Sequence, residues 1–141
     1  MWYNSIMAFV LRSPLHGMLS KSTLLITYTG RKSGKTYTTP VNYIQVEDGL
    51  LVTSYRKRTW WRNLRGGVSV TLRLQGKDRQ ATTEVYEDDE NVPRYLATYL
   101  SKAPQVAKYF NVSLDEKGAP NLADVRQAAV ERVIVHIQLA G

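Results

Sequence analysis

The sequence predicts one domain with a mainly β fold, an antiparallel β-barrel of about six strands decorated with helices. The 141 residues suit a single domain, and 43% hydrophobic with 22% charged residues is an ordinary balance for a globular core. Short runs rich in β-branched and aromatic residues occupy the centre of the chain, and helical patterns follow later. Within one domain at 1–141, we expect a helical segment at 1–19, barrel strands at 22–87, a helical insertion at 88–129 and a final strand at 131–140.

The first residues of the chain are apolar. Trp2, Ile6, Phe9 and Val10 recur at helical spacing, which predicts a short helix that packs on the body of the domain. The unbroken apolar run at 6–11 is far shorter than the roughly 20 residues that span a bilayer, and no basic region precedes it as in a signal peptide. The alternative is a helix that makes a peripheral membrane contact or covers a ligand.

The first barrel strands are predicted from β-forming residues and turn signals. Ser22–Thr29 is rich in Thr, Ile and Tyr and ends at Gly30. Lys35–Val46 follows as a second strand, and the Asp-Gly pair ending at Gly49 predicts a hairpin to Leu50–Tyr55. This part of the chain should therefore form consecutive antiparallel strands.

A short helix interrupts the strands before they resume. We expect this helix over 59–65 (Thr59–Arg65), because two glycines follow it and Thr59 is a candidate N-cap. In Val68–Leu74 the apolar residues alternate strictly with polar ones, which predicts a half-buried strand. After a turn, Gln80–Glu87 is expected to form the next strand.

The helical insertion is predicted from amphipathic spacing. Asp88–Lys102 begins with acidic residues and continues with apolar residues at helical intervals, so we expect a helix that Pro104 ends. Gln105–Phe110 should restart it. A third helix is expected at Leu122–Ala129, capped by the preceding Asn121.

The chain closes with a strong strand, Glu131–Leu139, in which alternate residues are apolar. Strands joined by hairpins, with one strand returning at the end, favour an antiparallel barrel. Such short strands cannot enclose a wide cavity. A ligand should therefore sit outside the barrel or in a groove beside the helices.

Several catalytic classes find no support in the sequence. There is no cysteine, which excludes disulfides, thiolate metal sites and a cysteine nucleophile, and which fits a reducing compartment such as the cytoplasm. His16 and His136 lie in unrelated segments, and His136 faces the polar side of its strand, so no metal site is predicted. The acidic run at 87–90 coincides with a helix start and needs no catalytic role. A hydrolase or metal enzyme is therefore disfavoured.

The basic residues gather in specific places. The net charge is +7, and 13 of the 19 Lys and Arg residues lie in the first 80 positions. The loop Gly30-Arg31-Lys32-Ser33-Gly34-Lys35 joins two strands and combines two glycines, three cations and a hydroxyl. Backbone N–H groups and cations in such a turn form a nest suited to a phosphate. It is not a P-loop, because a strand follows it, and a solvated basic hairpin remains an equal alternative.

Two further features follow in the sequence. Arg56-Lys57-Arg58 comes directly after a strand, and because strand ends lie close together in a barrel, it could enlarge the same anion site. Trp60 and Trp61 stand next in the predicted short helix with Asn63. We expect one tryptophan in the core and the other against a flat ring.

These residues, taken together, resemble a known family. Leu24–Lys35, Thr39–Tyr43, Val52–Ser54 and Trp60–Leu64 occur in the order seen in the deazaflavin (F420)-dependent nitroreductases. The family pattern is a T-T-G-R-K-S-G hairpin, a T-P-L-x-Y strand and a W-Y-x-N-L helix. The resemblance runs from Ser22 to Glu87, and the order of several motifs makes it specific.

The resemblance implies a split β-barrel of the flavin-reductase-like superfamily, related to the FMN-binding pyridoxine-phosphate oxidase fold. It also implies an oxidoreductase that transfers a hydride from reduced F420 to an electron-poor small molecule of the nitro, quinone or enone type. The implied cofactor-binding residues are listed by position: Arg31, Lys32, Ser33 and Lys35 for the phosphate and glutamate tail, Pro40 and Tyr43 below the ring, Ser54, Trp60 and Asn63 beside it, and Arg56 and Lys57 as further cations.

The proton donor and the substrate stay open at this point. Tyr43 and Ser54 are the candidate catalytic residues, and Tyr95, Tyr99 or Tyr109 of the helical region are further candidates. The family often has a longer, glycine-containing loop where this chain has residues 55–59, so the contacts of Arg56–Arg58 are not transferable in detail. The later helices match no pattern that would name the acceptor.

Three other functions remain open. An FMN-binding reductase of the same fold is the nearest, and a non-catalytic carrier of a lipid on this fold is suggested by the apolar N-terminus. A nucleic-acid-binding barrel would fit the isoelectric point of 9.7 and the nine tyrosines. However, the cations cluster at two loops and a helix instead of following a strand face, so we predict no nucleic-acid partner. Both a monomer and a homodimer fit the sequence.

Overall fold

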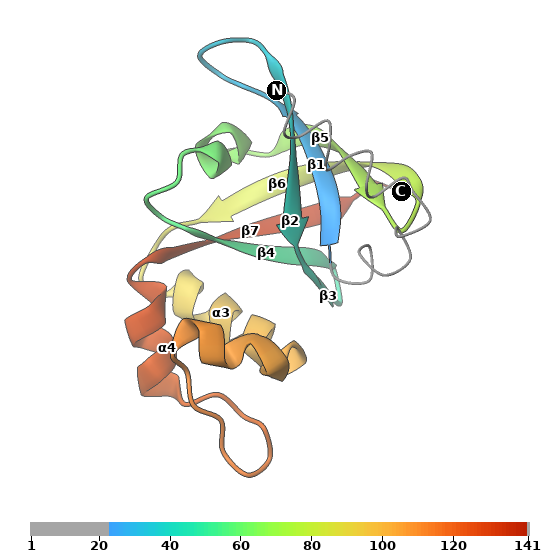
Figure 1. Ribbon diagram of the computed structural model, residues 1–141. Helices are drawn as coiled ribbons and strands as arrows, with labels where there is room; N and C mark the ends of the chain where they lie inside the picture. Colours follow the sequence, from blue (N-terminus) through green and yellow to red (C-terminus); the bar gives the residue numbers. More distant parts are fainter. Residues whose placement is uncertain (1–22, 141) are drawn as a thin grey trace.

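The computed structural model describes residues 23–140, and the predicted helical segment at 1–19, with its membrane alternative, lies outside them. Seven strands form one antiparallel sheet in the order β2-β1-β5-β6-β7-β4-β3 (Figure 1). Their bounds are β1 Thr23–Thr29, β2 Thr36–Asn42, β3 Ile44–Val46, β4 Gly49–Tyr55, β5 Val68–Leu74, β6 Lys77–Tyr86 and β7 Arg132–Leu139. The sheet is curled into a split barrel, which confirms the predicted fold class.

One predicted strand is divided in the structure. Lys35–Val46 becomes β2 and β3, separated by Tyr43, which gives seven strands where about six were expected. β2 pairs with β1 along its whole length, whereas β3 pairs with β4, with Ile44 opposite Leu51. A single chain segment therefore supplies both edges of the sheet.

The turn before β4 requires its glycine. Gly49 has φ +150°, and a Cβ atom there would lie 2.1 Å from the carbonyl oxygen of Ile137 on β7. No side chain fits between the two strands at this point. The predicted hairpin is thus confirmed, and the close approach of β4 to β7 explains why glycine ends the turn.

The sheet has an apolar core on each face. The inner core fills the barrel and includes Trp61 and Leu64 of η1, a short 3-10 helix at Trp60–Leu64. The outer core lies between the sheet and the helices, and includes Leu51 and Ile134. β7 serves both, because Val133, Val135 and Ile137 face inward while Ile134 faces the helices. The face of β7 that also carries His136 is therefore largely covered by helices.

Helices cover the outer face of the sheet (Figure 1). They are α3 at Asn91–Lys102, η2, a 3-10 helix at Pro104–Phe110, and α4 at Leu122–Ala129. The longest has 12 residues, and no helix in the described part of the chain is both long and apolar enough to cross a bilayer.

The helix starts test two predicted caps and one predicted helix boundary. Asn121 caps α4 as expected, because its Oδ1 accepts a hydrogen bond from the backbone N–H of Asp124 at 3.0 Å. Thr59 holds the N-cap position of η1, as expected, but its side chain makes no capping hydrogen bond. The predicted helix over 88–102 begins at Asn91, since the Asp88 carboxylate accepts the N–H of Asn91 at 2.8 Å and stays outside the helix.

Candidate functional site

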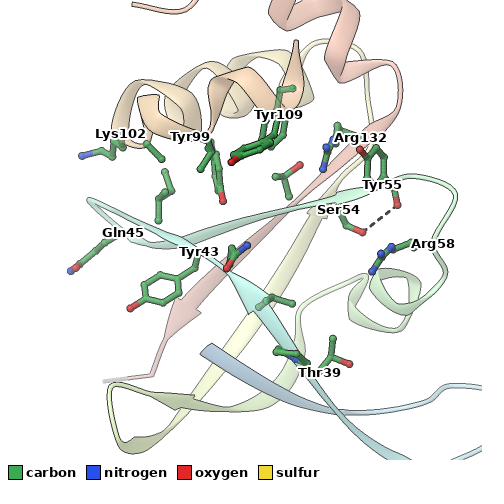
Figure 2. Close-up of a pocket in the computed structure, with 18 of the residues that line it drawn as sticks. Thr39, Tyr43, Gln45, Ser54, Tyr55, Arg58, Tyr99, Lys102, Tyr109 and Arg132 are labelled. Atoms are coloured by element: carbon green, nitrogen blue, oxygen red, sulfur yellow. Dashed lines mark hydrogen bonds between the residues drawn. The ribbon is translucent and has the colours of Figure 1, made fainter. Parts of the chain in front are cut away.

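A groove of about 900 Å³ opens where the sheet fails to close. β2 is an edge strand, and between it and the end of β4 the barrel is split. α3 and η2 form the opposite wall, and Arg132 enters from the start of β7 (Figure 2). The groove therefore lies outside the barrel and beside the helices, as the length of the strands predicts.

The floor of the groove comes from the segment that changes strand partners. Thr39, Pro40 and Val41 of β2 line it, followed by Tyr43. Pro40 suits an edge strand because it has no N–H to donate to a further strand. Tyr43 is 7% exposed and packs in the inner core, where its hydroxyl accepts a hydrogen bond from Nε2 of Gln75 at 3.4 Å. The predicted positions Pro40 and Tyr43 thus both lie at the groove.

Ser54 and Trp60 form a fixed corner of the groove. Nε1 of Trp60 donates to Oγ of Ser54 at 3.0 Å, and the Ser54 hydroxyl donates to the carbonyl of Tyr55 at 3.2 Å. Ser54 is 6% exposed. Because its one proton is already engaged, Ser54 is better placed to hold the wall than to give up a proton.

The basic hairpin, residues 30–35, lies beyond the groove at the other end of β2. Lys35 is about 13 Å along the strand from Thr39, the first groove residue of β2. Arg31 ties the hairpin to η1, since its N–H donates to Oδ1 of Asn63 at 3.0 Å and its guanidinium donates to the carbonyl of Arg65. Asn63 in turn donates to the carbonyl of Trp60 at 3.0 Å. Asn63 therefore links the hairpin to the groove wall.

The hairpin itself is ordered by short-range hydrogen bonds. Ser33 Oγ accepts from the N–H of Lys35 at 3.2 Å and lies 3.2 Å from the hydroxyl of Tyr37. A Cβ at Gly30 would come within 2.8 Å of the Tyr37 ring, so a larger residue there would displace that ring. Lys32 and Lys35 are exposed. The four predicted anion-binding residues are thus together on one surface turn.

The three cations of the second basic cluster, Arg56–Arg58, make different contacts. The Arg56 guanidinium donates to the carbonyls of Glu87 at 2.9 Å and Arg132 at 3.0 Å, which makes it a brace for the chain. The Lys57 ammonium lies 5.7 Å from the centre of the Tyr55 ring. Arg58 alone of the three lines the groove.

The aromatic end of the groove, formed by Tyr55, Phe110 and Arg132, was not predicted from the sequence. The Arg132 guanidinium carbon lies 3.8 Å from the centre of the Tyr55 ring and 4.3 Å from that of Phe110. Burial lowers the pKa of this guanidinium from its ordinary value, although the nearby Tyr55, Glu131 and Tyr99 side chains oppose that shift. Arg132 still carries its charge at neutral pH. The only sequence signal was a cation at the first position of the last strand.

The charges that line the groove are all of one sign. Arg58, Lys102 and Arg132 contribute cations, and no carboxylate is among the lining residues of the described chain. Of the candidate helix tyrosines, Tyr99 and Tyr109 line the groove, whereas Tyr95 stacks on Tyr86 with ring centres 4.8 Å apart. Burial raises the pKa of Tyr99. Within residues 23–140, no group of His, Asp and Glu side chains could hold a metal ion.

Comparison with known families bears on this geometry. The model of the F420H(2)-dependent quinone reductase family matches residues 11–115, which is most of the chain and includes the basic hairpin and every lining residue of the groove except Arg132. No functionally curated protein matches the sequence.

Solved structures share the fold at low sequence identity. An FAD- and haem-binding protein from Mycobacterium smegmatis superposes with a TM-score of 0.57 at 14% identity, over 89% of this chain and 65% of that one. A putative pyridoxamine 5'-phosphate oxidase from Listeria innocua gives 0.55 at 10%, over 93% and 94%. An F420-H2 dependent reductase gives 0.50 at 17%, over 82% and 94%. This chain spans just under two thirds of the Mycobacterium smegmatis protein, and these identities show a common fold alone.

Proposed function

Because the chain belongs to the F420H(2)-dependent quinone reductase family and is an F420-dependent oxidoreductase, we propose that its groove brings F420 and a quinone-type acceptor together. The observation that carries this proposal is the lining of the groove, in which residues 23–140 contribute aromatic walls and three cations but no carboxylate. Its volume of about 900 Å³ lies in the upper range of small-molecule sites. Two flat molecules therefore have room there.

The residues present fit the proposed cofactor. F420 carries a phosphate and a glutamate tail, both anionic, on a flat deazaflavin ring. Pro40, Tyr43 and Trp60 offer apolar surfaces to the ring, while Arg58 supplies a cation within the groove. The hairpin cations stand further along β2, where a tail that leaves the groove past Thr39 would reach them. We assign Lys32 and Lys35 to the tail, because Arg31 is already engaged with η1.

When bound, the reduced cofactor would supply the hydride, and the protein's own part is to orient and to exclude water. The Trp60–Ser54 hydrogen bond keeps one wall rigid, and Asn63 ties that wall to the hairpin. Tyr43 and Ser54 are thus assigned to positioning. Tyr99 would stay protonated at neutral pH because burial raises its pKa. The acceptor would enter beside α3 and η2, the wall opposite β2.

The extra cations favour F420 over FMN. FMN ends in one phosphate, which Arg58 and its neighbours could satisfy, and this would leave the exposed lysines of the hairpin without a ligand. A longer anionic tail gives them one. A carrier of a neutral lipid is disfavoured for the same reason, since burying cations beside an apolar chain is unfavourable.

The test is a set of titrations followed by quenching of tryptophan fluorescence. F420, a deazaflavin without the glutamate tail, and FMN are each added to the purified protein, with Trp60 as the expected reporter. We expect F420 to bind most tightly and the tail-less compound less well. Oxidation of reduced F420 is then followed by absorbance with a naphthoquinone as acceptor. Tight binding of FMN with none of F420 would contradict the proposal.

A further inference from the structure

Arg132 is the one half-buried cation in the described chain that faces the groove. We infer that its guanidinium binds the oxygen of the electron acceptor and stabilises the negative charge that this oxygen gains during reduction. The inference rests on the proposed function and deepens it, because it names the residue that recognises the acceptor.

The position of Arg132 separates it from the expected cofactor surface. It begins β7 on the face of the sheet that meets the helices, and its side chain reaches the groove next to Tyr109 and Tyr55 (Figure 2). Arg58 lies lower in the same view, on the loop that leads to Trp60, and Lys102 lies at the far end of α3. Arg132 is therefore the half-buried cation that meets the helical wall, where an acceptor would enter, whereas Lys102 on α3 is exposed.

The guanidinium N–H groups of Arg132 are free to donate hydrogen bonds to a ligand. Tyr55 and Phe110 pack on the guanidinium, and such ring contacts leave N–H groups in its plane free to donate. Within residues 23–140 the Arg132 side chain forms neither a hydrogen bond nor a salt bridge. The neighbouring Glu131 carboxylate acts on the guanidinium by charge but forms no salt bridge with it, so this half-buried cation has lost hydration that an electron-rich oxygen would restore.

Its surroundings hold the guanidinium in place. The two aromatic rings fix its orientation, and the carbonyl of Arg132 itself accepts a hydrogen bond from Arg56 at 3.0 Å. A donor that is oriented before the reaction stabilises developing charge without reorganisation. This is the property expected of an oxyanion-binding group.

The chemistry balances with Arg132 protonated throughout. A quinone that gains a hydride, which is two electrons and one proton, becomes a hydroquinone monoanion with its charge on oxygen. Reduced F420 is the reductant and leaves oxidised. One proton from solvent then converts the monoanion to the hydroquinone. Arg132 gives no proton, and its share is to donate hydrogen bonds to the oxygen before and during the transfer.

The test compares two naphthoquinones of similar shape. 2-Hydroxy-1,4-naphthoquinone is an anion at neutral pH, whereas 2-methoxy-1,4-naphthoquinone is neutral. Their equilibrium binding is measured on the protein with oxidised F420 and without cofactor. We expect Arg132→Gln to weaken the anion by roughly 10- to 100-fold, as for hydrogen bonds to a charged group, and to weaken the neutral compound far less. Arg132→Lys should recover part of the loss, because it keeps the charge without the planar fork.

A matched control and a spectrum separate recognition from packing. Arg126→Gln removes one exposed positive charge on α4, outside the groove, and should change neither affinity. In infrared difference spectra, the carbonyl stretch of the bound neutral quinone should move to higher frequency in Arg132→Gln than in the wild type, because a hydrogen bond is lost. The midpoint of thermal unfolding shows whether each variant is folded. If Arg132→Gln is not folded, the same measurements are made on Arg132→Lys.

Two outcomes would overturn the inference. Equal loss of both naphthoquinones, with no change in the carbonyl stretch, would mean that Arg132 only packs the wall. A fall in F420 affinity as large as the fall for the anion would make Arg132 a cofactor anchor. Failure of the wild type to bind F420 would instead count against the proposed function, and the measurements without cofactor would still report on Arg132.

Discussion

The basic hairpin and the aromatic end of the groove are both cationic, but they hold their charges in different ways. Lys32 and Lys35 of the hairpin are exposed and hydrated, so they attract anions over a distance and are screened by salt. Arg132 has lost part of its hydration between two rings. The first arrangement suits long-range attraction of an anion, and the second suits a close contact with a single oxygen atom, as proposed above.

The two regions also differ in what keeps them in place. The hairpin is stabilised by contacts within residues 30–37 and by two hydrogen bonds from Arg31, one to Asn63 of η1 and one to the carbonyl of Arg65. The aromatic end needs β4, η2 and β7 to meet, and Arg56 joins the loop after β4 to the carbonyl of Arg132. Loss of a brace should therefore damage the second region and spare the first.

The largest effect is expected from Arg56→Met, which removes hydrogen bonds to the carbonyls of Glu87 and Arg132. We expect the free energy of unfolding to fall by about 2–3 kcal/mol, as for loss of charged hydrogen bonds in a partly buried place. Urea unfolding measures it, with an unchanged slope as the sign that the folded state is otherwise intact. Lys57→Met is the control, and a similar loss there would show that Arg56 is not a special brace.

A second substitution weakens the aromatic end without removing its charge. Phe110→Leu keeps apolar packing but takes one ring from Arg132, and cation–π contacts of this kind contribute about 0.5–2 kcal/mol. We expect the KM for a naphthoquinone to rise by about fivefold, in line with the middle of that range, while F420 affinity is unchanged. Steady-state kinetics and fluorescence titration measure the two. Tyr95→Leu, whose ring stacks on Tyr86 outside the groove, should alter neither.

A third test addresses the hairpin. Lys32→Ala combined with Lys35→Ala should weaken F420 by about threefold at physiological salt, more at low salt, and hardly at all in high salt, because exposed charges are screened. The tail-less deazaflavin should bind the variant as it binds the wild type. Lys108→Ala with Lys117→Ala removes two exposed lysines elsewhere and serves as control. A loss of F420 affinity that does not depend on salt concentration would show that the hairpin lysines do more than attract the cofactor over a distance.

The smallest expected effect is on the stability of the fold at acidic pH. It should leave both cationic regions unaltered. The pKa of the Asp88 carboxyl is lowered, chiefly by the N–H of Asn91, so this group stabilises the fold above its unfolded pKa of about 4 and less as the pH falls below that value. Asp88→Asn should lessen the drop in stability between neutral and acidic pH. Thermal unfolding at a series of pH values measures it, and an unchanged pH profile would mean that the cap is not formed in solution.

Local patterns predicted most of the strands and the cap of α4. Val68–Leu74 and the last strand follow directly from their alternation, and Asn121 from its place before an apolar run. The division at Tyr43 could not be predicted in this way, because the residues on both sides are equally suited to strands. Which neighbour each half pairs with is decided by the closing of the whole sheet.

In the candidate site, too, residues that are adjacent in the sequence could be predicted, and residues that the fold brings together could not. The hairpin is visible in the sequence because its glycines and cations are adjacent. Arg132 is not, since its rings come from a strand end and a 3-10 helix far away in the chain. Arg56 and Arg58 look alike in sequence, and only the positions of the Glu87 and Arg132 carbonyls distinguish the brace from the groove residue.

The open edge of β2 has a consequence for self-association. An unpaired strand edge invites another strand to add to the sheet, and long regular edges are sites of aggregation. Here the edge is broken in its middle by Pro40, which offers no N–H, and it turns away at Tyr43. The gap that admits a ligand is thus kept open by a strand that another chain cannot readily extend.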